Sequence, residues 1–129
     1  MYGQNTNLQD KNAFLLLDIM TKKTEHLLVL STCPGTISAK RIAQGLVSEK
    51  LAACVNIVPG VQSFFSWVGK VEKANELLLV IKTTADNYEA LEKHLNKLHP
   101  YELPEIIAVP ILTGSVEYLN WISTTTGKS

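Results

Sequence analysis

Apolar residues follow two different periods along this chain, and the changes of period divide it into elements. Residues 26–33 form an apolar run that ends at Pro34-Gly35, which is typical of a buried strand. From residue 36 to about residue 50 the apolar side chains recur at helical spacing, and Thr36 or Ser38 is the expected N-cap. The apolar positions of this predicted helix are Ala39, Ile42, Ala43, Leu46 and Val47.

The longest β-type stretch covers residues 51–84 and contains two apolar, β-branched runs joined by a turn at Gly69-Lys70. Both runs exceed the usual strand length of about five or six residues. Pro59-Gly60 interrupts the first run, and these residue types suit a bulge because proline donates no backbone hydrogen bond and glycine tolerates unusual φ angles. We therefore expect a long hairpin that projects from its domain, with edges that pair with other strands.

Helical spacing returns after residue 84. Residues 86–89 resemble a capping box, and Pro100 ends the helix because the residue before a proline avoids the α region. A strand over residues 105–111 follows, and Pro110 within it indicates an edge strand or a bulge. The apolar stripe of the predicted helix consists of Tyr88, Leu91, Leu95 and Leu98.

A short helix from Val116 to about Ser123, capped by Ser115, completes the pattern, with Val116, Leu119 and Ile122 toward the core. The predicted order is β-α-β-β-α-β followed by a C-terminal helix. This order is typical of the ferredoxin-like α+β fold, in which two helices cover one face of an antiparallel sheet.

Composition places the chain among soluble globular proteins of one domain. Its 129 residues carry twelve basic and twelve acidic side chains, which balance. The sequence therefore lacks the basic stripe that nucleic-acid binding would need. No apolar run is long enough for a membrane span. The two cysteines, Cys33 and Cys54, are too few for a disulfide framework and indicate reduced thiols in a cytoplasmic protein.

The first 24 residues are interpreted as an N-terminal extension, with a short helix over residues 14–20, and residues 25–129 as the folded domain. Asp18 interrupts the apolar run of residues 13–20, and no small-residue cleavage site follows it. The alternative is a degenerate targeting segment.

Four short motifs occur in a fixed order after this extension. They are EKLAACVN at residues 49–56, SWVGKVE at residues 66–72, IKTT at residues 81–84, and HPY at residues 99–101 with Pro104-Glu105 behind it. Together they resemble the CutA family of divalent-cation tolerance proteins, over residues from about 27 to 122. The resemblance implies a ferredoxin-like subunit assembled as a homotrimer, in which strands of each subunit pair with its neighbours. It also implies binding of copper or another divalent cation, a role in the response to metal ions, and no catalytic reaction.

His99, Glu102 and Cys33 are the candidate metal ligands. His99 stands at the expected end of the second helix, beside a loop that carries Glu102, and imidazole and carboxylate groups suit Cu(II) or Zn(II). The alternative for His99 is a histidine that caps the helix.

The family comparison also marks two departures at this site. Copper-binding relatives carry a cysteine where this chain has Ser31 and a second histidine where it has Leu98. Cys33 lies two residues beyond Ser31, on the same side of the strand, and is the expected partial substitute. We therefore expect weaker copper binding than in those relatives.

A second group of residues is expected to line a small polar ligand pocket between subunits, because it combines donors and acceptors with aromatic side chains. Simpler interpretations are an inert buried thiol at Cys54, an ammonium at Lys82 that reaches back to water, and a core or interface anchor at Trp67. The predicted pocket residues are Trp67, Lys82, Tyr101, Glu105 and Cys54.

These observations favour a cytoplasmic, non-enzymatic homotrimer that binds a metal ion or a small anion, without nucleic-acid or membrane partners. Two alternatives remain open. One is an enzyme that uses Cys54 with His99. The other is a small-molecule- or anion-binding signalling trimer of the PII type, although the chain has no glycine-rich phosphate loop.

Overall fold

The structure is a computed structural model that describes residue 13 and residues 25–127. The predicted helix over residues 14–20 therefore lies outside the described residues. The order of strands and helices from residue 26 onward confirms the predicted one. The elements are β1 (His26–Cys33), α2 (Thr36–Ser48), β2 (Cys54–Trp67), β3 (Lys70–Thr84), α3 (Ala85–Leu98), β4 (Ile107–Pro110) and α4 (Val116–Thr125).

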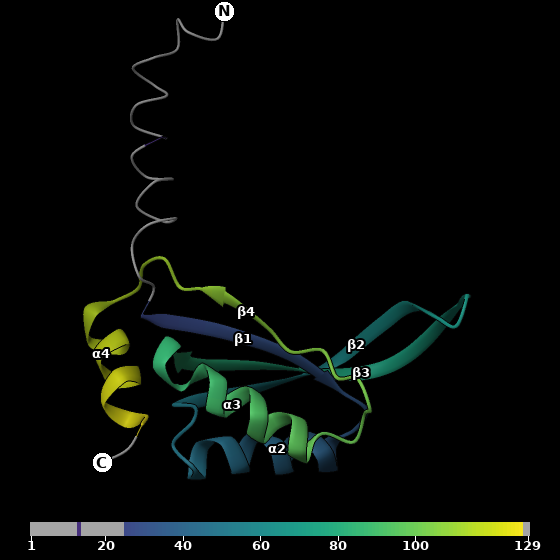
Figure 1. Ribbon diagram of the computed structural model, residues 1–129, viewed down its shortest axis with the longest axis horizontal. Helices are drawn as coiled ribbons and strands as arrows, with labels where there is room; N and C mark the ends of the chain where they lie inside the picture. Colours follow the sequence, from purple (N-terminus) through teal and green to yellow (C-terminus); the bar gives the residue numbers. More distant parts are fainter. Residues whose placement is uncertain (1–12, 14–24, 128–129) are drawn as a thin grey trace, which may run out of the picture.

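The four strands form one sheet in the order β2-β3-β1-β4, and every neighbouring pair is antiparallel. Helices α2 and α3 lie side by side on one face of this sheet, α4 lies at one end, and the β2–β3 hairpin projects from the other end (Figure 1). This is the ferredoxin-like α+β arrangement predicted from the sequence. No helix among the described residues is long and apolar enough to cross a membrane.

The core lies between the sheet and the two helices α2 and α3. Alternate strand positions supply one half of it, and the apolar stripes of the two helices supply the other. Burying each of the larger side chains contributes about 1.5–3 kcal/mol. The fully buried apolar side chains here are Val29, Cys33, Ala39, Ile42, Leu46, Leu79, Ile81, Leu91 and Leu95.

The opposite side of the sheet, which we call the open face, is covered less completely. Leu30 and Val80 are half-buried there, and Val109 of β4 is 41% exposed. Helix α4 contacts β1 and β3 only at one end of the sheet. An apolar sheet face therefore remains partly open in the isolated chain.

The hairpin confirms the predicted bulge and moves the predicted turn by one residue. The register between β2 and β3 shifts between Val58 and Val61, and Gly60 has a φ of 82°. Trp67 pairs with Lys70, so the turn consists of Val68 and Gly69 rather than Gly69-Lys70. Both turn residues have positive φ angles, 50° and 76°, as in a two-residue type I′ turn.

Two of the three predicted helix caps are wrong. Gly35 is the N-cap of α2, and the Ser38 hydroxyl donates to its carbonyl at 3.1 Å instead of capping the helix. Helix α3 begins directly after Thr84, one residue before the predicted capping box, and no side chain caps its first turn. The predicted Ser115 cap of α4 is confirmed, since its Oγ accepts from the Tyr118 amide at 3.3 Å.

The last two elements also differ from the sequence prediction. β4 has four residues instead of the expected seven, because it pairs only with residues 27–30 of β1, and it is an edge strand as Pro110 indicated. In α4, Ile122 is fully buried but Val116 is 73% exposed. The first turn of α4 therefore lies beyond the part of the helix that covers the sheet.

We expect Val68→Asn to raise the free energy of unfolding by about 1 kcal/mol, because a β-branched residue is strained at positive φ and asparagine tolerates that conformation. Urea unfolding at fixed protein concentration measures this difference. The matched control is Val71→Asn, at a residue that is 79% exposed and has no positive φ. An equal gain in the control, or a loss of stability at residue 68, would contradict the strain argument.

Candidate functional site

The structure distributes the predicted site residues over three places, and the first is the loop after α3. His99 is 7% exposed at the end of this helix. Its Nε2 lies 2.8 Å from the Thr32 carbonyl oxygen, and its Nδ1 accepts the Tyr101 amide at 3.0 Å. Since a carbonyl only accepts, Nε2 carries the hydrogen, and both ring nitrogens are occupied.

Tyr101 connects this loop to the base of the hairpin. Its hydroxyl donates to Glu76 Oε2 at 2.8 Å, and its ring lies 4.9 Å from the His99 ring. Glu76 belongs to β3 and is 7% exposed. Burial raises the pKa of Tyr101 to about 12, with further contributions from the hydrogen bond to Glu76 and its charge. The Tyr101 cluster, as we call Thr32, Glu76, His99 and Tyr101, thus holds the loop against the sheet.

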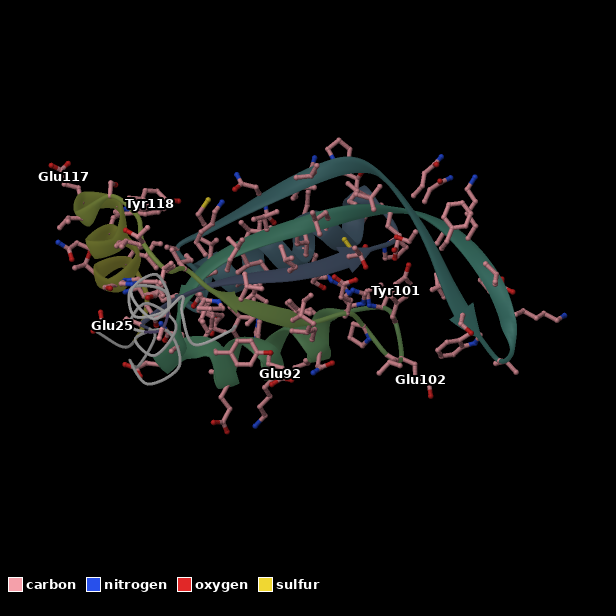
Figure 2. All side chains as sticks on the ribbon, turned by 90° about the horizontal axis from the view of Figure 1, so that it is seen from above. Glu25, Glu92, Tyr101, Glu102, Glu117 and Tyr118 are labelled. Carbon is pink, nitrogen blue, oxygen red and sulfur yellow. The ribbon has the colours of Figure 1, made fainter. Side chains whose placement is uncertain are left out.

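The other two predicted metal ligands do not join His99. Cys33 is fully buried in the core, and burial raises the pKa of its thiol against the opposing hydrogen bond with Ser38. Glu102 and Glu105 are exposed. In Figure 2, Glu102 is directed away from the sheet, whereas Tyr101 lies beside the sheet. Among the described residues, no three His, Cys, Asp or Glu side chains gather as they would around a metal ion.

The second place is on the open face, close to α4. Cys54 of β2 pairs with Lys82 of β3, and the Lys82 ammonium lies 3.8 Å from the Cys54 sulfur and donates to the Asn56 side chain. Burial raises the pKa of Tyr118 on α4, and the adjacent Cys54 raises it further through its charge and a hydrogen bond. We call Cys54, Asn56, Lys82 and Tyr118 the Cys54 cluster. Figure 2 shows Tyr118 and Tyr101 toward opposite ends of the sheet.

Trp67 is the third place, at the tip of the hairpin, where it is 50% exposed. At a rise of about 3.3 Å per residue, the ends of a 14-residue strand are roughly 40 Å apart. Trp67 therefore lies far from Cys54 within one chain. A pocket that contains both requires residues of more than one chain.

Sequence reasoning missed Glu76, Asn56 and Tyr118. Asn56 has a usable signal, because it is two residues after Cys54 and alternation puts both on one face. Glu76 is the acidic residue that precedes the apolar run of β3, and its burial depends on a loop about 25 residues later. Tyr118 reaches the cluster only through the placement of α4, which no local pattern predicts.

A divalent cation fits these residues poorly as they are arranged. Coordination by His99 needs a free nitrogen lone pair, but Nδ1 accepts the Tyr101 amide and Nε2 carries a hydrogen. Ser31 is fully buried on β1, and its hydroxyl has no hydrogen-bond partner among the described residues. A hydroxyl also replaces a soft thiolate poorly as a ligand for copper.

The sequence of the chain is similar to those of known proteins. A family model described as CutA1 divalent ion tolerance protein matches residues 27–125. The chain is 50% identical over 99 residues to the divalent-cation tolerance protein CutA of Thermus thermophilus, covering 77% of this chain and 96% of the relative. It is 45% identical over 106 residues to the protein CutA, chloroplastic, of Arabidopsis thaliana, covering 82% of this chain. It spans 58% of that plant relative's length.

A solved structure gives the same result at the level of the fold. The divalent cation tolerance protein (Cut A1) from Thermus thermophilus superposes with a TM-score of 0.78 at 48% sequence identity. The match covers 79% of this chain and 99% of the solved one.

We expect Tyr101→Phe to lower the free energy of unfolding by about 1–3 kcal/mol at pH 7, because the buried Glu76 carboxylate loses its hydrogen-bond donor. Because the folded state raises the pKa of Tyr101 from 10.0 to about 12, it holds the phenol proton more tightly than the unfolded state. The contribution is therefore complete below about pH 10 and is lost as the pH rises through about 12. Thermal unfolding at several pH values measures both effects.

The matched control is Tyr88→Phe, since Tyr88 packs against the core and its hydroxyl makes no hydrogen bond with the described residues. This control should lose little stability. A Tyr101→Phe protein as stable as the control would mean that the bond to Glu76 does not hold the loop.

Proposed function

Since this chain belongs to the CutA1 divalent ion tolerance family, we propose that it acts in the response to divalent metal ions as a homotrimer that binds ions such as copper weakly and catalyses no reaction. The observation that carries the assembly is the exposed apolar surface of the hairpin. The observation that limits the metal binding is the full occupation of both His99 nitrogens.

The projecting hairpin supports a trimer. A two-stranded ribbon alone buries little surface, yet this one carries large apolar side chains in water. One long edge of β2 also has no strand partner among the described residues. Pairing among three copies would cover both the side chains and the edge. The exposed aromatic side chains of the hairpin are Phe64 (65%), Phe65 (43%) and Trp67 (50%).

Metal binding by His99 carries a cost that the resemblance alone did not indicate. The imidazole must release either the Thr32 carbonyl or the Tyr101 amide, which costs on the order of 1–3 kcal/mol for a buried group. That cost corresponds to a loss of about five- to 150-fold in affinity.

The absence of catalysis is supported by the separation of the two residues that an enzyme would combine. His99 bonds to the Thr32 carbonyl of β1, and Thr32 pairs with Leu78 of β3. Cys54 pairs with Lys82, which lies four positions further along β3. Four positions along a strand span about 13 Å.

Balanced charge argues against nucleic-acid partners, and two reduced cysteines favour the cytoplasm.

A second candidate, a small-anion-binding signalling trimer of the PII type, is favoured by the Cys54 cluster. The Lys82 ammonium is half-buried, and its contacts are a thiol and an amide rather than a carboxylate. An ammonium in this setting retains the ability to bind an anion.

Sedimentation equilibrium at micromolar concentration should give three times the chain mass of 14.2 kDa. Trp67→Ala should shift the equilibrium toward monomer, because a half-exposed tryptophan at the tip would lose its burial in a neighbour. Leu103→Ala, at an exposed residue of the loop after α3, serves as the control and should leave the mass unchanged. A wild-type monomer at this concentration would refute the proposal.

Calorimetric titration with Cu(II) should show weak binding to the wild type and loss of most of it in His99→Gln. Glutamine retains a donor for Thr32 but supplies no imidazole. The double variant Ser31→Cys with Leu98→His should bind at least about tenfold more tightly, because it adds a thiolate and a second imidazole.

His94→Ala is the control for a histidine elsewhere on the same helix, α3, and should leave copper binding unchanged. Equal affinity in the wild type and His99→Gln would place the metal away from the loop after α3.

A further inference from the structure

A thiol and an amine lie in contact on the open face of the sheet. Cys54 and Lys82 are direct partners in the register between β2 and β3, and both side chains are half-buried. The Lys82 ammonium donates to the Cys54 sulfur, with 3.8 Å between Nζ and Sγ, and it also donates to the side-chain oxygen of Asn56. Strand pairing therefore holds a nucleophilic sulfur next to a nitrogen that can bond to it.

The surroundings of Cys54 favour its reactive form. The thiolate is the nucleophile, and reactive cysteines are partly exposed and lie beside a positive charge that stabilises the thiolate. The hydrogen bonds of Lys82 go to an amide oxygen and to this sulfur, and neither acceptor is a carboxylate. Burial raises the pKa of Tyr118, and the adjacent Cys54 raises it further, so this residue stays a neutral phenol and does not compete for the ammonium.

An oxidised Cys54 has no second thiol within reach in the same chain. Cys33 is the only other cysteine of the sequence, and it is buried on the helix side of the sheet. Its partner on β3 is Leu77, five positions from Lys82, or about 17 Å along the strand. A disulfide between the two cysteines is incompatible with this separation. The Lys82 amine is the nucleophile that the structure places beside the Cys54 sulfur.

We propose that Cys54 and Lys82 form a redox-modification site, in which hydrogen peroxide oxidises the thiol and the lysine amine then closes a covalent sulfur–nitrogen link across β2 and β3. In the first step the thiolate sulfur attacks one oxygen of the peroxide, the O–O bond breaks, and a sulfenic acid forms. The Lys82 ammonium gives a proton to the departing hydroxide, which leaves as water. Lys82 is then a neutral amine.

In the second step the Lys82 nitrogen attacks the sulfenic sulfur and the S–O bond breaks. The hydroxyl group leaves with one amine proton as a second water, and the product is a sulfenamide. The sulfur has lost two electrons, and the peroxide has been reduced to two waters. An external thiol reverses the link by attacking the sulfur and releasing the amine, and a second thiol then frees Cys54.

The link is compatible with the sheet. Side chains at directly opposite positions have Cβ atoms about 4.5–5.5 Å apart, and the flexible four-carbon stem of a lysine can bring its nitrogen to the sulfur across that distance. The link would tie β2 to β3 next to α4 and remove the ammonium charge from the open face. It requires neither a metal ion nor a second chain, so its test is independent of the functions proposed above.

The full chain is treated with a small molar excess of hydrogen peroxide, and its intact mass is measured at neutral pH. We expect a product that has lost two hydrogen atoms and returns to the starting mass with dithiothreitol. Before reduction, trypsin should fail to cleave after Lys82 and should release a cross-linked pair of peptides that contain Cys54 and Lys82. A product that stops at a sulfenic or sulfinic acid, or that is a disulfide, would overturn the proposal.

Lys82→Arg separates the charge of residue 82 from its ability to attack sulfur. Arginine stays protonated, so the thiolate keeps a cationic neighbour but has no amine to react with. Cys54 should still be oxidised, but the product should gain an oxygen, react with dimedone and lack the link. Lys70→Arg, at an exposed position of the same strand, is the matched control and should form the link as the wild type does. A loss of two hydrogen atoms in Lys82→Arg, or no link in the control, would refute the role of Lys82.

Discussion

β3 pairs with β1 over residues 77–84 and with β2 along most of its length, so the position of every candidate functional group depends on the register of this strand. Side chains alternate along it, and Leu79 and Ile81 therefore face the helices while Lys82 faces the open side. A slip of one residue would move the apolar set into water and the lysine into the core. Burial of the core thus fixes the Cys54 cluster as firmly as it fixes the fold.

Much of this fold is predictable because its signals are local. The periods of apolar residues, the proline after α3 and the bulge at Pro59-Gly60 each act within a few residues of themselves. The caps of α2 and α3 were mispredicted for a related reason. Serine and asparagine side chains have several backbone partners within reach. As an N-cap, the Ser38 hydroxyl would accept from a backbone amide of the first turn, but in the structure it donates to the Gly35 carbonyl.

The candidate site was less predictable, because its chemistry depends on which atoms remain free after folding. The sequence identifies His99 as a ligand type, but only the structure shows that a strand carbonyl and a loop amide occupy its nitrogens. Glu76 shows the reverse case. A carboxylate beside an apolar run looks like a surface residue, and Tyr101, 25 residues away, makes it a buried acceptor. Membership of the CutA1 family supplies the biological setting, while the free atoms determine the chemistry.

The bulge in β2 acts as a phase shift between the two halves of the hairpin. On its near side Cys54 pairs with Lys82, and on its far side Trp67 pairs with Lys70, with one extra residue of β2 accommodated between them. The inner half of β2 is tied to the core, whereas each aromatic residue near the tip lies on the face of its β3 partner, Phe64 with Lys73 and Trp67 with Lys70. If β2 kept all its residues but had no bulge, its side chains would alternate without interruption, and Phe64 and Trp67 would turn to the opposite face while the core contacts stayed in place. The bulge, more than the composition of the strand, therefore decides which face the aromatic side chains of the tip present to a neighbour.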